Sequence, residues 1–138
     1  MFNVYLSSTS YHWWNITGYT WKSKLIKLCR KYSKSKINFI DPLVYKSEDP
    51  IVCELDIKDI NNSSFVVIYL DKITIGTMLE LAYCLFKRNK TSWCIYSTNK
   101  KVLKHPWILS LCKENIYKDI NDISRIIVKK SKQFYNYG

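Results

Sequence analysis

The sequence predicts an α/β fold in which a five-stranded, mostly parallel sheet is covered by helices on both faces. Short runs of β-branched and aromatic residues alternate along the 138 residues with segments whose apolar residues recur at helical spacing. One of these runs, residues 65–70 (FVVIYL), is apolar at every position. Such a run is typical of a central strand that is buried on both faces.

Five strands are expected from the apolar runs. The expected strands span residues 3–6, 37–40, 65–70, 93–96 and, as a weak run, 115–117. The second strand ends at Asp41 and Pro42, and a helix could not continue through this proline either. A chain of this length fits one domain, so we expect residues 1–138 to form a single flavodoxin- or Rossmann-like domain.

The first two helices have recognisable start signals. Thr17 is the expected N-cap of the first helix, in which Trp21, Leu25 and Cys29 lie on one face. Asp49 and Pro50 open the second helix, because aspartate is favoured at the cap and proline at the first helical position.

Gly76 and Thr77 open the third helix, residues 78–87, which is apolar nearly all round and should therefore be buried. The last helix, residues 119–134, has acids in its first turn and lysines in its last, which matches the helix dipole. Its inward side chains are expected to be Ile120, Ile123, Ile127 and Phe134.

The formal net charge of +11 creates a positive potential that attracts phosphate-bearing molecules. The basic residues are nevertheless dispersed along the sequence, at helix ends and on polar faces. This distribution favours a solvated surface over a nucleic-acid footprint, so a nucleic-acid partner is not expected.

No run approaches the roughly 20 apolar residues of a membrane span, and the first residues lack the pattern of a signal peptide. We expect a soluble, cytoplasmic protein without a membrane partner. The five cysteines include no CxxC pair and the chain has two histidines, so we expect reduced, buried thiols, no metal site and no cofactor.

Glu80 is the sharpest candidate for chemistry, because it is the only charged residue between Lys72 and Lys87. A helix N-terminus would stabilise its carboxylate while apolar neighbours would strip it of water, which favours a reactive anion. The alternative is an acid in the first helical turn that only complements the dipole. Helix physics does not separate these two interpretations.

Other candidates are weaker. Taken alone, Asp56 fits a solvated helix face. The aromatic cluster of Tyr11, Trp13 and Trp14 could stack on a planar base, or it could belong to the core or an interface. His12 could move a proton, although a lone histidine in a loop is weak support for that role.

Taken together, these segments resemble the nucleoside 2-deoxyribosyltransferase family. The resemblance covers the chain but is dense only between Asp56 and Tyr83. It is carried by residues 4–7 (VYLS), Asp56-Ile57 before Ile60, residues 65–71 (FVVIYLD) and residues 76–83 (GTMLELAY).

The resemblance implies that Glu80 attacks the anomeric carbon of deoxyribose and that Asp56 handles the proton or holds the base. Asn115 would be supplied to a neighbouring subunit's site, and the tail of residues 134–137 would close that site. The implied substrate-binding residues are Tyr5, Ser7, Ser8, Trp13, Asp41, Asp71, Gly76, Thr77, Asn115, Tyr135 and Tyr137. The implied partners are deoxynucleosides and free nucleobases, or deoxynucleotides, together with further copies of the chain in a homo-oligomer with shared active sites.

Two positions depart from the family pattern. Thr74 stands where some members have an acid, and residues 7–10 (SSTS) replace the glycine- and arginine-containing phosphate loop of the monophosphate hydrolases. Three functions remain open: a deoxyribosyltransferase, an N-glycosidase that uses water as acceptor, and a non-catalytic module that binds nucleotide or nucleic acid.

Overall fold

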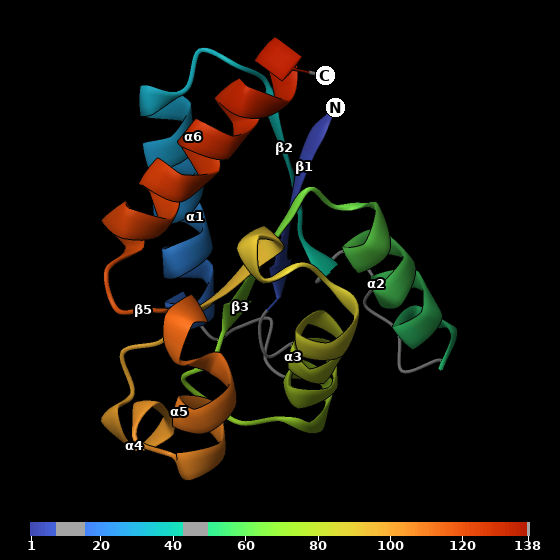
Figure 1. Cartoon of the computed structure of the whole chain (residues 1–138), viewed down its shortest axis with the longest axis vertical. Coiled ribbons are helices and arrows are strands. Elements are labelled where there is room, and N and C mark those ends of the chain that lie inside the picture. Colours follow the sequence, from blue (N-terminus) through green and yellow to red (C-terminus); the bar gives the residue numbers. More distant parts are fainter. Residues whose placement is uncertain (8–15, 43–49, 138) are drawn as a thin grey trace.

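The five strands form one sheet in which every described pair is parallel, as the sequence predicts. The computed structural model describes residues 1–7, 16–42 and 50–137, with the backbone alone for residues 16–20 and 137 (Figure 1). The sheet order is β2-β1-β3-β4-β5. The strands are β1 (Phe2–Ser7), β2 (Ile37–Ile40), β3 (Phe65–Tyr69), β4 (Trp93–Tyr96) and β5 (Ile116–Tyr117).

The strand order reverses between β1 and β3, and this reversal determines where a ligand can bind. From β1 the chain moves outward to β2, and it then returns to the other side of β1 to form β3. Ser7, the last residue of β1, lies opposite Ile68 of β3. In open parallel sheets the crevice beyond the carboxyl ends of two such strands is the usual ligand site.

Helices cover both faces of the sheet (Figure 1). On one face lie α1 (Ile16–Tyr32) and α6 (Ile120–Tyr137), and on the other lie α2 (Ile51–Asn62) and α3 (Ile75–Lys87). The short helices α4 (Lys100–Leu103) and α5 (Pro106–Cys112) follow the carboxyl end of β4. This layered arrangement is the predicted α/β fold.

Each face of the sheet has its own apolar core, because successive strand residues point to opposite sides. Val4 and Leu6 pack with Leu25 of α1 and Ile127 of α6. Tyr5, between them in sequence, belongs to the core beneath α2 and α3. The alternation therefore directs the Tyr5 ring toward the helices that carry Asp56 and Glu80.

Helix starts differ from the sequence expectation at two places. Helix α1 begins at Ile16, so Thr17 lies inside the helix and is not its cap. Helix α3 begins at Ile75, because Thr74 is the N-cap and its side chain accepts a hydrogen bond from the Thr77 backbone N–H. Glu80 therefore lies in the second turn of α3 and not in the first.

The start of α2 agrees only in part with the expectation. The helix begins at Ile51, after Pro50, which adopts helical backbone angles. Asp49, the predicted cap, lies outside the described residues.

The prediction that α3 is buried all round is wrong. Leu81 and Cys84 face the sheet and are buried. Ile75, Leu79 and Phe86 are 82%, 64% and 74% exposed. The reason is geometric, because a helix packed on a sheet buries one stripe, and no other described element covers the outer stripe of α3.

Helix α6 extends beyond its predicted end. Ile120, Ile123 and Ile127 are buried as expected, whereas Phe134 is 39% exposed. Because the helix continues to Tyr137, its lysines lie before the last turn, which contains no basic residue.

Three further observations concern the cysteines, the helix lengths and the possible metal ligands of the described residues. Cys29, Cys84, Cys94 and Cys112 are buried, whereas Cys53 is exposed on α2. Within the described ranges no helix is both long and apolar enough to cross a membrane, and no group of three or more His, Cys, Asp or Glu side chains could hold a metal ion.

Candidate functional site

Glu80 of α3 is the centre of the candidate site. Its side chain is largely withdrawn from solvent, and the Tyr5 hydroxyl of β1 donates a hydrogen bond of 3.5 Å to its Oε1 atom. The other oxygen, Oε2, is buried and has no hydrogen-bond partner among the described residues. A buried carboxyl oxygen without a partner is unusual in proteins and is available to a ligand.

The environment of Glu80 raises its pKa from 4.5 to about 7. Burial is the main cause, and the nearby charge of Asp56 acts in the same direction. The Ser7 and Tyr5 hydroxyls and the charge of Lys22 oppose the rise. Near neutral pH the carboxyl group is therefore poised between its charged and neutral forms.

Ser7 completes the β1 side of the site. It is fully buried at the carboxyl end of the strand, and its hydroxyl lies close enough to Glu80 to lower the pKa of that carboxyl group. Its Oγ atom nevertheless makes no hydrogen bond of sound geometry with any described residue. Ser7 Oγ and Glu80 Oε2 are therefore two unsatisfied polar atoms at the same end of the sheet.

Asp56 approaches the site from α2. Its Oδ1 atom is buried and has no hydrogen-bond partner within the described part of the chain. Burial, followed by the charge of Asp59, raises the pKa of Asp56 to about 6. The charge of Asp56 also raises the pKa of Glu80 and that of Tyr5, so the three groups lie in one electrostatic cluster. Sequence reasoning alone favoured a solvated Asp56, and the fold turns it inward.

Arg88 links the two helices that carry these carboxyl groups. Its guanidinium group donates hydrogen bonds to the carbonyl oxygens of Ile60 and Ser63, at the end of α2. The same side chain also donates to Ser92 Oγ, at 3.2 Å, in the segment before β4. Because Arg88 directly follows α3, it holds the end of that helix against the end of α2.

The structure adds Lys22, a residue that the sequence reading placed on a solvated surface. Lys22 is only 4% exposed, and its Nζ donates to Asp41 Oδ1 at 2.7 Å. Burial lowers the pKa of Lys22, while Asp41 and Glu80 act to raise it. The sequence feature that could have indicated the burial of Lys22 is its position three residues before Leu25, because this spacing places it at the edge of the buried stripe of α1.

Asp41, a predicted substrate-binding residue, lies directly after β2 and is held by Lys22. Its side chain is 33% exposed, so it remains partly open to solvent. The ion pair joins α1 to the carboxyl end of β2, next to the strand that carries Tyr5 and Ser7.

Gly76 and Thr77 lie in the first turn of α3. Thr77 is buried, and its backbone N–H and Oγ1 both bond to Thr74 Oγ1, so it serves the helix cap. Gly76 is exposed, and a Cβ atom placed on it would meet no atom of the described residues within 4 Å. The packing of the described residues therefore does not require glycine there.

The carboxylate of Asp71 is fully hydrogen-bonded to groups of its own chain. It accepts hydrogen bonds from the Tyr69 and Ser97 hydroxyls and from both the N–H and the hydroxyl of Thr98. Burial acts to raise the pKa of Asp71, but these donors outweigh it and hold the pKa below the ordinary value. Asp71 therefore ties the end of β3 to the segment after β4.

Two other predicted residues lie at the opposite edge of the sheet. The Asn115 side chain donates to the carbonyl oxygens of Lys90 and Trp93, at the amino end of β4. The Tyr135 hydroxyl accepts from the Phe2 N–H and donates to the Lys36 carbonyl oxygen, at the amino ends of β1 and β2. Both side chains are engaged within their own chain, away from Glu80.

Ser8 and Trp13, together with Tyr11, His12 and Trp14, lie outside the described residues, as does the side chain of Tyr137. The described site therefore consists of Tyr5, Ser7, Lys22, Asp41, Asp56, Asp59 and Glu80.

This arrangement suits chemistry at an electron-poor carbon. Glu80 offers a buried oxygen without a partner, and Asp56 has a pKa at which it can hold or release a proton near neutral pH. Two carboxyl groups in different environments are the usual basis for a nucleophile and an acid or base within one site.

Comparison with known proteins identifies the fold. No family model matches the chain, and no curated protein matches it. Among solved structures, a 2-deoxyribosyltransferase from Bacillus psychrosaccharolyticus aligns with a TM-score of 0.63 and 13% identity, over 88% of this chain and 90% of that chain. A conserved protein from Enterococcus faecalis V583 aligns with a TM-score of 0.66 and 15% identity, over 94% and 99%. The chain has a nucleoside 2-deoxyribosyltransferase-like fold.

Proposed function

We propose that this chain is a cytoplasmic nucleoside 2-deoxyribosyltransferase that exchanges the base of 2′-deoxynucleosides. The observation that carries the proposal is that the carboxyl group of Glu80 lies buried beside the point where the strand order reverses between β1 and β3. Its Oε2 atom has no hydrogen-bond partner among the described residues. The likeness of the fold to a solved 2-deoxyribosyltransferase supports the same reaction class.

In the first half of the reaction, Glu80 Oε2 attacks C1′ of the deoxyribose while the bond from C1′ to the base nitrogen breaks. The base leaves with the bonding electron pair, and Asp56, in its protonated form, supplies the proton that neutralises it. The product is a deoxyribosyl ester of Glu80. Tyr5 donates to Oε1 and so fixes the carboxyl plane, leaving Oε2 for the attack.

In the second half, a nitrogen of the incoming base attacks C1′ and the ester bond breaks, which restores the Glu80 carboxylate. The proton of that nitrogen returns to Asp56. Two displacements at one carbon give net retention, as in glycosidases that use a carboxylate nucleophile. The reaction needs no cofactor, because each step uses only these two carboxyl groups and the two bases.

We further propose that the chain assembles as a homo-oligomer. The exposed stripe of Ile75, Leu79 and Phe86 on α3 supports a protein contact, as does Trp107 of α5, which is 72% exposed. Exposed apolar surfaces of this kind commonly mark protein interfaces. Because the stripe lies on the helix that carries Glu80, the subunit contact would adjoin the site.

The decisive experiment is base exchange. The purified protein is incubated with thymidine or deoxyinosine and free adenine, and the products are separated by chromatography beside those of Glu80→Ala. Deoxyadenosine formed only by the intact protein supports the proposal. Free base and deoxyribose without exchange would instead assign an N-glycosidase. If no product forms from nucleosides or their 5′-monophosphates, both enzymatic assignments fail.

A further inference from the structure

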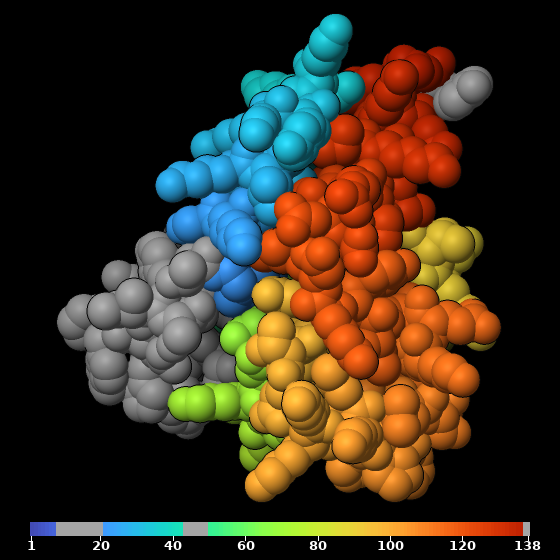
Figure 2. All heavy atoms as spheres, turned by 90° about the vertical axis from the view of Figure 1, so that its left-hand side faces the viewer, coloured from blue at the N-terminus to red at the C-terminus, as the bar shows by residue number. Residues whose placement is uncertain are grey.

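The fold brings two basic helices together that the sequence separates by almost the whole chain. Helices α1 and α6 pack against each other on one face of the sheet, and Figure 2 shows them side by side. Ser33 Oγ and Ser131 Oγ, at the ends of this contact, lie 3.4 Å apart. The outer sides of both helices therefore form one continuous surface.

We call this surface the α1/α6 face. Ten exposed basic side chains lie on it, on the turn after α1 and immediately before α6: Lys24, Lys27, Arg30, Lys31, Lys34, Lys36, Lys118, Arg125, Lys129 and Lys132. The exposed acids on these same segments are Asp119 and Asp122. Ten bases against two acids leave an excess of eight positive charges on one side of the molecule.

The protein itself neutralises little of this charge. Arg125 pairs with Asp122 at 2.9 Å, and within the described residues the other nine bases make no ion pair. Complementing the helix dipole explains Arg30 and Lys31 in the last turn of α1, but it does not explain the remaining lysines.

On the opposite face of the sheet, helix α2 has the opposite charge balance, with Glu54, Asp56 and Asp59 against a single Lys58. Eight of the eleven net positive charges of the sequence therefore lie on the α1/α6 face. A one-sided distribution produces a directed positive potential that attracts polyanions and aligns them.

We propose that the α1/α6 face binds nucleic acid through its phosphate backbone, without sequence preference. Seventeen residues of α1 span roughly 25 Å, so lysines along it can contact several phosphates of one strand or duplex. This revises the expectation of dispersed and merely solvated charge, because two segments that are distant in the sequence combine on one face.

The apolar residues of the face favour nucleic acid over a lipid surface. Binding to a membrane interface requires exposed apolar side chains that can insert. Along the described outer side of α1 and α6, Tyr32 is exposed beside Lys31, whose Nζ lies 5.2 Å from its ring. Phe134 and Tyr135, at the end of α6, are engaged with Phe2 and Lys36. Phe134 and Tyr135 are partly exposed but held by these contacts, so the aromatic rings of the face suit base stacking better than insertion into lipid.

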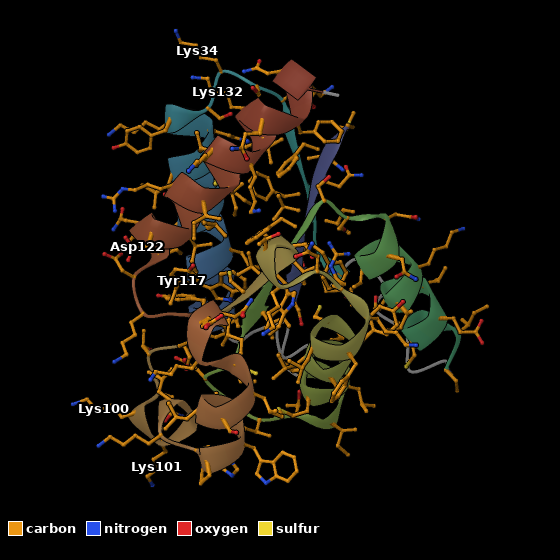
Figure 3. All side chains as sticks on the ribbon, in the orientation of Figure 1. Lys34, Lys100, Lys101, Tyr117, Asp122 and Lys132 are labelled. Carbon is orange, nitrogen blue, oxygen red and sulfur yellow. The ribbon has the colours of Figure 1, made fainter. Side chains whose placement is uncertain are left out.

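This face is separate from the candidate active site. Lys34 and Lys132 lie at the end of the molecule where β1 begins, as Figure 3 shows, whereas α3, the helix that contains Glu80, lies toward the other end in Figure 1. The proposal therefore does not depend on the proposed enzymatic reaction.

The test is fluorescence anisotropy with labelled duplex and single-stranded DNA over a range of NaCl concentrations, from about 50 to 200 mM. We expect measurable binding at the lowest salt, with log K falling against log[NaCl] at a slope of about −3.5 to −5.5, which corresponds to roughly four to six phosphate contacts.

Two charge-reversal variants with the same net charge locate the binding surface. The variant K27E/K31E/K129E should weaken DNA binding at least about tenfold and flatten the salt slope. The matched control K58E/K87E/K104E changes exposed lysines away from the α1/α6 face and should bind almost as the unaltered protein does. Circular dichroism and base exchange should be unchanged in both variants.

Three outcomes would overturn the proposal. One is no DNA binding at the lowest salt. Another is an equal loss in both variants, which would show that total charge alone is responsible. The third is binding to vesicles containing phosphatidylserine with no binding to DNA, which would assign the face to a membrane surface.

Discussion

Tyr5 and Glu80 lie 75 residues apart in the sequence, and in the folded chain the Tyr5 hydroxyl donates a hydrogen bond of 3.5 Å to Glu80 Oε1. The tyrosine is fully buried at the centre of the sheet, and the glutamate comes from the helix that follows β3. Burial strongly raises the pKa of Tyr5, so the phenol remains a neutral donor. This contact orients Glu80 and lowers its pKa.

Removing that donor should shift the pH dependence of the reaction. In Tyr5→Phe the charged form of Glu80 loses a hydrogen bond of about 0.5 to 1.5 kcal/mol, so kcat/KM at neutral pH should fall roughly two- to tenfold. The pH optimum of kcat/KM should move to higher pH, because the pKa of Glu80 rises. A profile of kcat/KM against pH checks this, and an unshifted optimum would contradict it.

Glu80 should make the protein less stable at high pH. Its pKa is about 7 in the folded chain against 4.5 ordinarily, so between these values the folded state binds more protons than the unfolded state. The free energy of unfolding should therefore fall by about 2 kcal/mol between roughly pH 5 and pH 8 because of this group. In Glu80→Gln this loss should be absent, although activity is abolished. Urea unfolding at both pH values tests the difference.

Lys22 should act as a positioning residue. In Lys22→Met the positive charge near Glu80 is lost, so the pKa of Glu80 should rise and the pH optimum of kcat/KM should move to higher pH, and Lys22→Arg should restore it in part. Losing this ion pair should also lower the free energy of unfolding, by about 1 kcal/mol, because Asp41 remains partly exposed to solvent.

The control for Lys22 is Lys24→Met, which removes an exposed lysine from the same helix. It should change neither the pH profile nor the stability appreciably. If Lys22→Met lowers stability but leaves the pH profile in place, Lys22 has a structural role only.

Gly76→Ala should separate stability from function. The added methyl group meets no atom of the described part of the chain within 4 Å, and alanine favours helix, so the free energy of unfolding should rise by about 0.5 to 1 kcal/mol. If substrate passes over this exposed turn, KM should rise while the structure stays intact. Thermal unfolding measured beside steady-state kinetics tests both expectations, and an unchanged KM would remove Gly76 from the site.

The exposed stripe of α3 should mediate self-association. Phe86→Glu places a charge on a side chain that is 74% exposed, so it should dissociate an oligomer without unfolding the subunit. Tyr32→Glu, at a 61% exposed position on α1, is the matched control and should leave the assembly intact. Light scattering after size-exclusion chromatography measures the mass. A monomeric unaltered protein would refute the oligomer proposal.

The local pattern of residues predicts the sheet well and the helix boundaries less well. The apolar run at residues 65–70 and the alternation of elements are sufficient for a parallel α/β fold. The short helices α4 and α5 were missed, although Asn99 and His105 cap them and Pro106 begins the second. Helices this short contain too few residues for a periodic pattern to emerge.

The sequence by itself determined the order of the elements and singled out Glu80 as the leading candidate for chemistry, because a lone acid in an apolar helix is visible without any structure. Only the tertiary structure decided which groups surround Glu80. Lys22 and Asp56 look like surface residues in the sequence, and they become neighbours of one carboxyl group because parallel strands bring their carboxyl ends to one edge. The same packing placed Asn115 and Tyr135 at the opposite edge and joined α1 to α6, since contacts between distant segments depend on how the sheet is assembled.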